Sequence, residues 1–229
     1  MFDGRFRAPV ERAVKPIGDG LKRTGLTPDH LTVIGLLIGV GAAFAIGSGH
    51  LLLGLFLVIL AALPDLLDGA LAKASDVASQ RGAFFDSTVD RITDMVLFGG
   101  VAWYLASEYS PHMVMLPFAV MGLSSLISYQ RAKAESLGLE AKGGLMERAE
   151  RVVLLCIGLV WEPLLVPVLW IMLVLTAITA VQRFQKVWNQ AQVAPATLAR
   201  IEMRRSRRQT RRVARVQRRR TRVPRRRDR

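Results

Sequence analysis

The 229 residues are 51% hydrophobic, with a mean hydropathy of +0.29 and a formal net charge of +14. The single cysteine, Cys156, excludes a disulfide or a cysteine metal site within the chain, and we interpret it as a small buried hydrophobe. The three histidines, His30, His50 and His112, lack the spacing of metal ligands. The net positive charge is not spread along the chain, because the 16 Arg and two acidic residues from Arg200 onward account for the whole excess of +14.

Residues 1–27 predict a cytoplasmic juxtamembrane amphipathic segment. Apolar residues such as Phe6 and Val10 are interleaved with Arg5, Arg7 and Lys15, which favours a helix lying in the membrane interface. An ordinary solvated helix is the alternative. We expect no cleavable signal peptide, because the first 30 residues lack a compact apolar core.

Six apolar runs follow, each of the length that a helix needs to cross a bilayer. We therefore predict an all-α integral membrane protein, with six transmembrane helices within residues 28–190 and the interfacial helix before them. Pro28, Pro111 and Pro167 are expected at helix starts or in connections, where proline is tolerated. The predicted spans cover residues of about 31–48, 51–73, 83–106, 113–133, 147–165 and 167–188.

Lys and Arg are distributed unevenly between the connections. They are absent near residues 48–51, 107–112 and 161–167, but frequent at both termini and in the connections at 73–82 and 131–151. Because basic residues are retained on the cytoplasmic side, this bias predicts that both termini are cytoplasmic, in a multi-pass protein of the cell membrane.

The basic tail, residues 191–229, is predicted to be disordered on its own, because it is rich in Arg and poor in apolar residues. Two partners are considered: anionic lipid headgroups of the cytoplasmic leaflet, and nucleic acid bound through its phosphates. No aromatic residues are interleaved with the Arg, so base stacking has no support. We favour anionic lipid or simple topological anchoring, and expect no nucleic acid.

Four carboxylates interrupt the second and third apolar runs. Asp65 and Asp68 are three residues apart, and Asp86 and Asp90 are four apart, so each pair lies on one face of its own helix. Two such faces turned toward each other would offer an all-oxygen site for Mg²⁺ or Mn²⁺. Neutralisation of buried Arg or Lys, or a proton or ion pathway, are the alternatives. Asp94, one turn further on, is interpreted as a salt-bridge partner, with Arg91 as the candidate.

The segment from Asp65 to Asp90 resembles the signature of the CDP-alcohol phosphotransferases, D-x2-D-G-x2-A-R-x8-G-x3-D-x3-D. It departs from that signature at one fixed position, where Lys73 stands in place of the family's Arg. A Lys still binds phosphate as a point charge but lacks the planar fork of Arg, which bears on how the nucleotide diphosphate is held.

Basic residues gather between the fourth and fifth predicted spans, and flanking charge of the positive-inside kind explains only part of them. The run from Ser128-Tyr129 through Gly143-Gly144 to the Glu-Arg-x-Glu-Arg element ending at Arg151 is similar to that of the actinobacterial phosphatidylinositol phosphate synthases. The similarity covers roughly residues 15–188 and leaves out the tail. It implies that an acceptor phosphate is bound by basic side chains, with Lys133, Arg151 and Arg183 as the first candidates and Arg131 and Arg148 next.

The resemblance implies transfer of a phosphatidyl group from CDP-diacylglycerol to inositol 1-phosphate, with release of CMP. It implies a two-metal site of Mg²⁺ or Mn²⁺ held by Asp65, Asp68, Asp86 and Asp90, with Asp90 also the catalytic base. The implied CDP-binding residues are Asp29, Thr32, Asp65, Asp68, Gly69, Ala72, Lys73, Gly82 and Asp86.

The family is generally homodimeric, so a homodimer is expected. Two other functions stay open. One is a phosphatidylglycerophosphate synthase that uses glycerol 3-phosphate, against which the Gly-Gly and Glu-Arg-x-Glu-Arg elements argue. The other is a non-catalytic transporter or tether.

Overall fold

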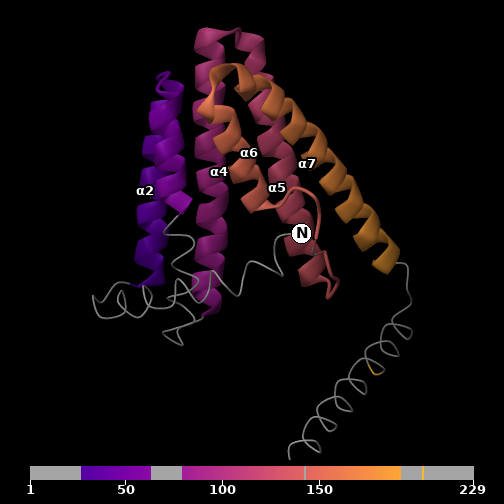
Figure 1. Cartoon of the computed structure of the whole chain (residues 1–229). Helices are drawn as coiled ribbons and strands as arrows, with labels where there is room; N and C mark the ends of the chain where they lie inside the picture. The colour runs from indigo at the N-terminus through magenta and orange to yellow at the C-terminus, as the bar shows by residue number, and fades with distance from the viewer. Residues whose placement is uncertain (1–26, 63–78, 142, 192–202, 204–229) are drawn as a thin grey trace, which may run out of the picture. The chain divides into compact units, whose positions relative to one another are not determined.

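The computed structural model describes residues 27–62, 79–141, 143–191 and 203, and these form helices with no strand among them (Figure 1). The predicted N-terminal interfacial helix and all but Met203 of the tail beyond Ala191 lie outside the described residues, as does the segment 63–78. Residues up to Phe184 belong to one compact unit, and the chain from Gln185 belongs to a second. The predicted domain limits at 27/28 and 190/191 therefore stay predictions.

The first described helix, α2 (Pro28–Gly47), has well-defined caps at both ends. The Thr27 hydroxyl accepts a hydrogen bond from the His30 N–H at 3.4 Å, and the His30 ring accepts one from the Thr27 N–H at 3.3 Å. This reciprocal pair satisfies amides that a helix start leaves unpaired. After the helix, Gly49 has a φ of +85° and begins the turn into the apolar helix Leu51–Ala62.

Helix α4 (Gln80–Glu108) packs against α2, and the two lie side by side in Figure 1. A Cβ on Gly100 would overlap the backbone of Ala43, so the two helix backbones approach closely at this point. Phe44 and Trp103 meet edge to face nearby, with ring centroids 5.6 Å apart. At its start, α4 is capped by Ser79, whose hydroxyl accepts from the Gly82 N–H at 3.0 Å.

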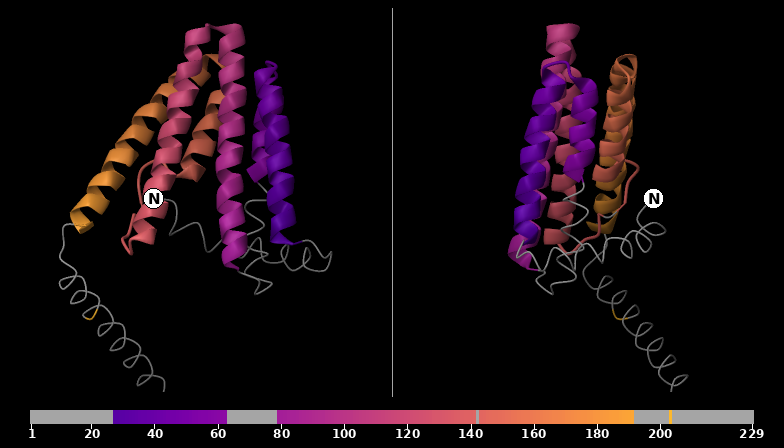
Figure 2. Two further views of the ribbon diagram at one scale, coloured as in Figure 1. Left: turned by 180° about the vertical axis from the view of Figure 1, so that it is seen from behind. Right: turned by 60° about the vertical axis from the view of Figure 1, so that its left-hand side comes forward.

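A 3-10 turn, η1 (Pro111–Val114), leads into α5 (Met115–Ser136), and α6 (Arg148–Val160) and α7 (Glu162–Ala191) follow (Figure 2). One prediction at the last junction was wrong. Pro167 was expected at a helix start or in a connection, but it lies inside α7, which begins five residues earlier after the break at Trp161. The missing N–H of Pro167 removes one bond near the start of a 30-residue helix, and membrane helices accommodate this loss.

The core of the compact unit is apolar, and so is much of its surface. Fully buried side chains come from six helices and include Ile46, Val58, Leu105, Val120, Leu159 and Leu169. Large apolar side chains such as Leu37, Phe44, Phe118 and Trp170 are more than half exposed. Apolar residues on both the inside and the outside of a helical bundle are typical of a protein surrounded by lipid.

Within the described residues, three helices are long and apolar enough to cross a membrane: Asp29–Gly47, Pro111–Ser136 and Glu162–Ala191. They correspond to the predicted first, fourth and sixth spans. The helix Leu51–Ala62 is shorter, α6 has 13 residues, and α4 carries several charged residues in its first half. The all-helical class is therefore confirmed, and the total of six spans stays a prediction.

Candidate active site

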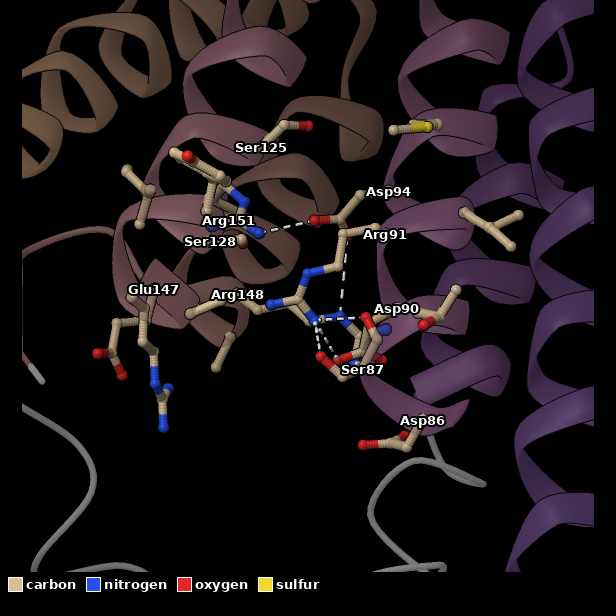
Figure 3. Close-up of a pocket in the computed structure, with 18 of the residues that line it drawn as sticks. Asp86, Ser87, Asp90, Arg91, Asp94, Ser125, Ser128, Glu147, Arg148 and Arg151 are labelled. Carbon is tan, nitrogen blue, oxygen red and sulfur yellow. Dashed lines mark hydrogen bonds and ion pairs between the residues drawn. The ribbon is translucent and has the colours of Figure 1, made fainter. Parts of the chain in front are cut away.

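A cavity of about 930 Å³ lies among α4, α5, α6 and α7 (Figure 3). Ten charged side chains line it, and among the described residues their signs balance. The acidic ones are Asp86, Asp90, Asp94, Glu135 and Glu147, and the basic ones are Arg91, Arg131, Arg148, Arg151 and Arg183. The cavity is thus highly charged although it lies within a largely apolar bundle, which points to a functional site.

The acidic side of the cavity comes from α4. Asp86, Asp90 and Asp94 recur every four residues, so they occupy one face at successive turns of this helix, as Figure 3 shows. The predicted pairing of Asp86 with Asp90 on one face is therefore found in the structure. Only 18% of the Asp90 side chain and 16% of the Asp94 side chain are exposed.

Two arginines of α6 face these carboxylates. Arg148 Nη1 lies 2.8 Å from Asp90 Oδ1, and Arg148 Nε lies 3.8 Å from Asp94 Oδ1. Arg151, three residues on, places its Nη2 2.7 Å from Asp94 Oδ2. The result is a connected row of alternating charges that runs from Asp90 to Arg151 and links the two helices.

The predicted pairing of Asp94 with Arg91 was wrong. Arg91 lies one residue after Asp90, and its Nη1 contacts the Asp90 carboxylate at 3.6 Å and donates to the Ser87 carbonyl at 2.7 Å. A residue three positions before Asp94 lies close enough to pair with it, but α6 presents a guanidinium directly opposite Asp94. The long-range partner Arg151 replaces the local one.

Arg183 of α7 reaches the cavity from the other side and is 4% exposed. Its guanidinium donates to the Ile127 carbonyl at 3.0 Å, to the Gly143 carbonyl at 3.0 Å and to a Glu147 carboxylate oxygen at 3.4 Å. Three acceptors, one from α5 and two from the segment before α6, fix the direction of this charge. It is therefore held in place before any ligand arrives.

The Gly143-Gly144 pair shapes the chain beside Arg183. Both residues have positive φ values, +96° and +147°, and a Cβ on Gly144 would collide with the Thr179 side chain. The Thr179 hydroxyl accepts from the Met146 N–H at 3.1 Å. These contacts hold the segment before α6 against α7, which brings Glu147 and the Gly143 carbonyl to Arg183.

The starts of α2 and α4 meet at a second, smaller cavity of about 20 Å³. Thr32 and Gly35 of α2 line it together with Asp86, Asp90 and Arg148. Nearby, a Cβ on Gly82 would stand 3.7 Å from a carboxylate oxygen of Asp29. The predicted CDP-binding residues Asp29, Thr32, Gly82 and Asp86 are thereby brought to one end of these two helices.

The remaining predicted residues of the nucleotide and metal site, Asp65, Asp68, Gly69, Ala72 and Lys73, lie outside the described residues. Within the described ranges, no group of three or more His, Cys, Asp or Glu side chains forms a metal site. Asp86 and Asp90, which line both cavities, are the part of the predicted carboxylate set that the structure describes.

Four of the five predicted acceptor-binding residues, Arg131, Arg148, Arg151 and Arg183, line the large cavity, and Lys133 does not. Helix α5 continues to Ser136, so Arg131 and Lys133 both belong to it. Residues two apart in a helix point to nearly opposite sides, and Lys133 is exposed on the far one. Arg131 sits at the rim, where it pairs with Glu135 at 3.1 Å.

Sequence reasoning assigned no role to Glu147, and it interpreted Asp94 as a salt-bridge partner without identifying Arg148 and Arg151 as its partners. The Glu-Arg-x-Glu-Arg element contains a signal for Glu147, since it precedes the first Arg of α6. That Glu147 contacts Arg183, 36 residues away, depends on tertiary packing and has no local signal.

Comparison with known proteins gives a consistent set of similarities. A family model of the CDP-alcohol phosphatidyltransferases matches residues 25–195. The phosphatidylinositol phosphate synthase of Mycobacterium marinum is 35% identical over 193 residues, which cover 80% of this chain and 82% of that protein.

Two crystal structures of the Mycobacterium tuberculosis phosphatidylinositol phosphate synthase are similar at 36% identity. The one with CDP-DAG bound has a TM-score of 0.73 and covers 77% of this chain and 94% of its own. The complex with manganese and citrate has a TM-score of 0.72 and covers 76% and 88%.

Proposed function

Because the chain belongs to the CDP-alcohol phosphatidyltransferase family, we propose that it transfers the phosphatidyl group of CDP-diacylglycerol to inositol 1-phosphate and releases CMP. The chain is a transferase. The single observation that carries a phosphorylated acceptor is the large cavity, in which four predicted phosphate-binding arginines stand beside the carboxylates of α4. The synthases of M. marinum and M. tuberculosis support it.

A divalent cation fits the donor set of this site. Asp86 and Asp90 offer carboxylate oxygens one turn apart on the same cavity walls, and hard cations such as Mg²⁺ and Mn²⁺ prefer such ligands. We propose that these two residues act with Asp65 and Asp68 in a two-metal site. The manganese complex of the mycobacterial enzyme supports a divalent cation. When bound, the metals would neutralise the pyrophosphate and stabilise the leaving CMP.

Asp90 is the proposed general base. Its carboxylate takes the proton from the acceptor hydroxyl, whose oxygen then bonds to the β-phosphorus while the bond from that phosphorus to the CMP oxygen breaks. Asp90 lies where the large cavity meets the small one, so it touches both the acceptor side and the nucleotide side. In the structure Arg148 Nη1 contacts this carboxylate at 2.8 Å.

The two substrates would occupy different ends of the site. Asp29, Thr32 and Gly82 gather at the starts of α2 and α4, on the proposed CDP side. Arg151 and Arg183, both almost fully buried, supply the acceptor phosphate side. Buried guanidiniums that are already oriented bind a phosphate without the entropic cost of ordering flexible side chains.

We further propose six membrane spans with both termini and the site on the cytoplasmic side of the cell membrane, and a homodimer. The bias of Lys and Arg supports the orientation, and the exposed apolar faces of α2, α5 and α7 support burial in lipid. The acyl chains of CDP-diacylglycerol would then remain in the bilayer while its headgroup enters the site.

The test is an acceptor competition with the purified chain, CDP-diacylglycerol and Mg²⁺ or Mn²⁺, in which CMP release is measured. Inositol 1-phosphate, glycerol 3-phosphate, free inositol and serine are compared. We expect turnover with inositol 1-phosphate and little with free inositol, which lacks the phosphate that the arginines bind. Preference for glycerol 3-phosphate would instead assign the chain as a phosphatidylglycerophosphate synthase.

A further inference from the structure

The carboxylate of Asp90 pairs with two arginines, Arg148 and Arg91. Arg148 Nη1 lies 2.8 Å from its Oδ1, while Arg91 Nη1 lies 3.6 Å from its Oδ2. Asp90 is also a proposed ligand of the divalent cation. A guanidinium and a dication on the same small carboxylate repel each other, so Arg148 and the metal compete for Asp90.

Because the charges of the large cavity balance, the competition for Asp90 changes how strongly the cavity attracts an anionic acceptor. Five acidic and five arginine side chains line it among the described residues, and Asp90 and Asp94 already neutralise Arg148 and Arg151. An anionic phosphate entering such a cavity must compete with these carboxylates. A dication that draws Asp90 away leaves the arginines with an excess of positive charge, which favours the anion.

We propose that Arg148 is an exchangeable counterion that couples the metal site to the acceptor site. It neutralises Asp90 until a divalent cation takes this carboxylate, and it then turns its guanidinium to the acceptor phosphate. The inference rests on the proposed function, because it uses the acceptor phosphate bound beside Arg151 and Arg183.

The position of Arg148 suits this exchange better than those of its neighbours. Its side chain is 28% exposed, compared with 6% for Arg151 and 3% for Arg183. It also lines both cavities, so a modest rotation moves its charge from one to the other. Arg151 and Arg183 are held tightly and serve as the fixed part of the acceptor site.

Coupling of this kind is reciprocal. If the cation raises the affinity for the acceptor, the acceptor raises the affinity for the cation by the same factor. The exchange also prepares the base, because Arg148 leaves the Asp90 carboxylate when the cation binds. The carboxylate oxygen that Arg148 has left would then receive the proton of the acceptor hydroxyl.

The test measures binding and needs no turnover. Inositol 1-phosphate is titrated calorimetrically into the purified full-length chain without CDP-diacylglycerol, once with Mn²⁺ and once with a chelator. We expect at least about a five-fold higher affinity with Mn²⁺, the lower end of typical coupling between two sites.

Three variants separate coupling through Arg148 from direct contact between metal and phosphate. In Arg148→Gln, the ratio of the two affinities should fall to nearly one. In Asp90→Asn, which should also lose turnover, binding with chelator should become tighter than in the wild type, since Arg148 has lost its main partner. Arg81→Gln removes an exposed arginine that lines neither cavity, and should keep the wild-type ratio.

Retention of the wild-type ratio in Arg148→Gln would overturn the coupling, and so would weaker or equal binding with chelator in a folded Asp90→Asn. The acceptor competition scores the proposed function separately. Normal turnover in the wild type, together with equal affinities for inositol 1-phosphate with Mn²⁺ and with chelator, would reject the coupling alone. No turnover with a preserved ratio would reject the reaction alone, and no binding of inositol 1-phosphate even with Mn²⁺ would reject both.

Discussion

Asp94 holds two arginines of α6 with one carboxylate. Its Oδ2 lies 2.7 Å from Arg151 Nη2 and its Oδ1 lies 3.8 Å from Arg148 Nε. The Arg151 side chain is only 6% exposed, so water cannot replace a lost partner. Removing one member of a buried ion pair leaves an uncompensated charge, which costs about 3–5 kcal/mol in other proteins. We therefore expect Asp94 to hold Arg148 and Arg151 in position on the cavity wall.

The variant Asp94→Asn should reveal this role. We expect a clearly lower melting temperature, together with a higher KM for inositol 1-phosphate and an unchanged KM for CDP-diacylglycerol. The split between the two KM values is the decisive measurement, because general loosening of the fold would raise both. An unchanged KM for the acceptor would show that Arg151 does not depend on Asp94.

Glu135→Gln is the matched control for stability. It also removes one carboxylate from an Arg pair of the same cavity, but Arg131 and Glu135 are about half exposed. Exposed ion pairs contribute about 0–1 kcal/mol, so the melting temperature should hardly change. A drop in melting temperature as large as that of Asp94→Asn would mean that burial of the ion pair does not determine how much its loss destabilises the protein.

At the scale of the elements, the contact of α2 with α4 depends on small residues. A Cβ on Gly100 would overlap the backbone of Ala43, whereas one on Gly99 would meet no atom within 4 Å. The two neighbouring glycines of one helix therefore provide a matched pair, one at the interface and one facing away from it.

Gly100→Ala should destabilise the protein by about 1–3 kcal/mol, because the backbone of α2 must move to admit the methyl group. Gly99→Ala should be neutral or stabilising by up to about 1 kcal/mol, since alanine favours the helix. Thermal unfolding in one detergent measures both. Equal melting temperatures would show that the close approach of the helices is not required.

The limits of sequence reasoning at this site follow from the range of the interactions. Asp86 and Asp90 were predicted together, because their spacing of four fixes a common helix face. The partner of Asp94 was not, because Arg151 is 57 residues away and only packing brings it near. Lys133 does not line the large cavity, and its predicted role at the acceptor stays a prediction. Periodicity thus gave the helices and the acidic wall of the site, and the resemblance to a known family named the arginines of the opposite wall. The ion pairs that join the two walls required the structure.

At the scale of the whole molecule, charge is strongly segregated. Before Arg200 the acidic and basic residues balance, and the large cavity repeats this balance locally among its described residues. The excess of +14 belongs to the 30 residues from Arg200 to Arg229. Since the family match ends at residue 195 and so leaves this segment out, the chemistry and the tail's charge are expected to be separable.

Deletion of residues 200–229 should therefore leave CMP release in detergent unchanged but weaken the attraction to anionic lipid. Each Arg near an anionic surface contributes about 1 kcal/mol at most, and this attraction falls with salt. Full-length and truncated protein in neutral-lipid nanodiscs would be sedimented with phosphatidylglycerol or phosphatidylcholine vesicles, at low and high salt. We expect only the full-length chain to sediment with the anionic vesicles, and only at low salt. Loss of turnover on truncation would show that the tail takes part in the site. Binding of the full-length chain to added RNA in preference to the anionic vesicles would identify nucleic acid as the tail's partner. Vesicles and RNA offer the same phosphate charge, but only RNA offers bases.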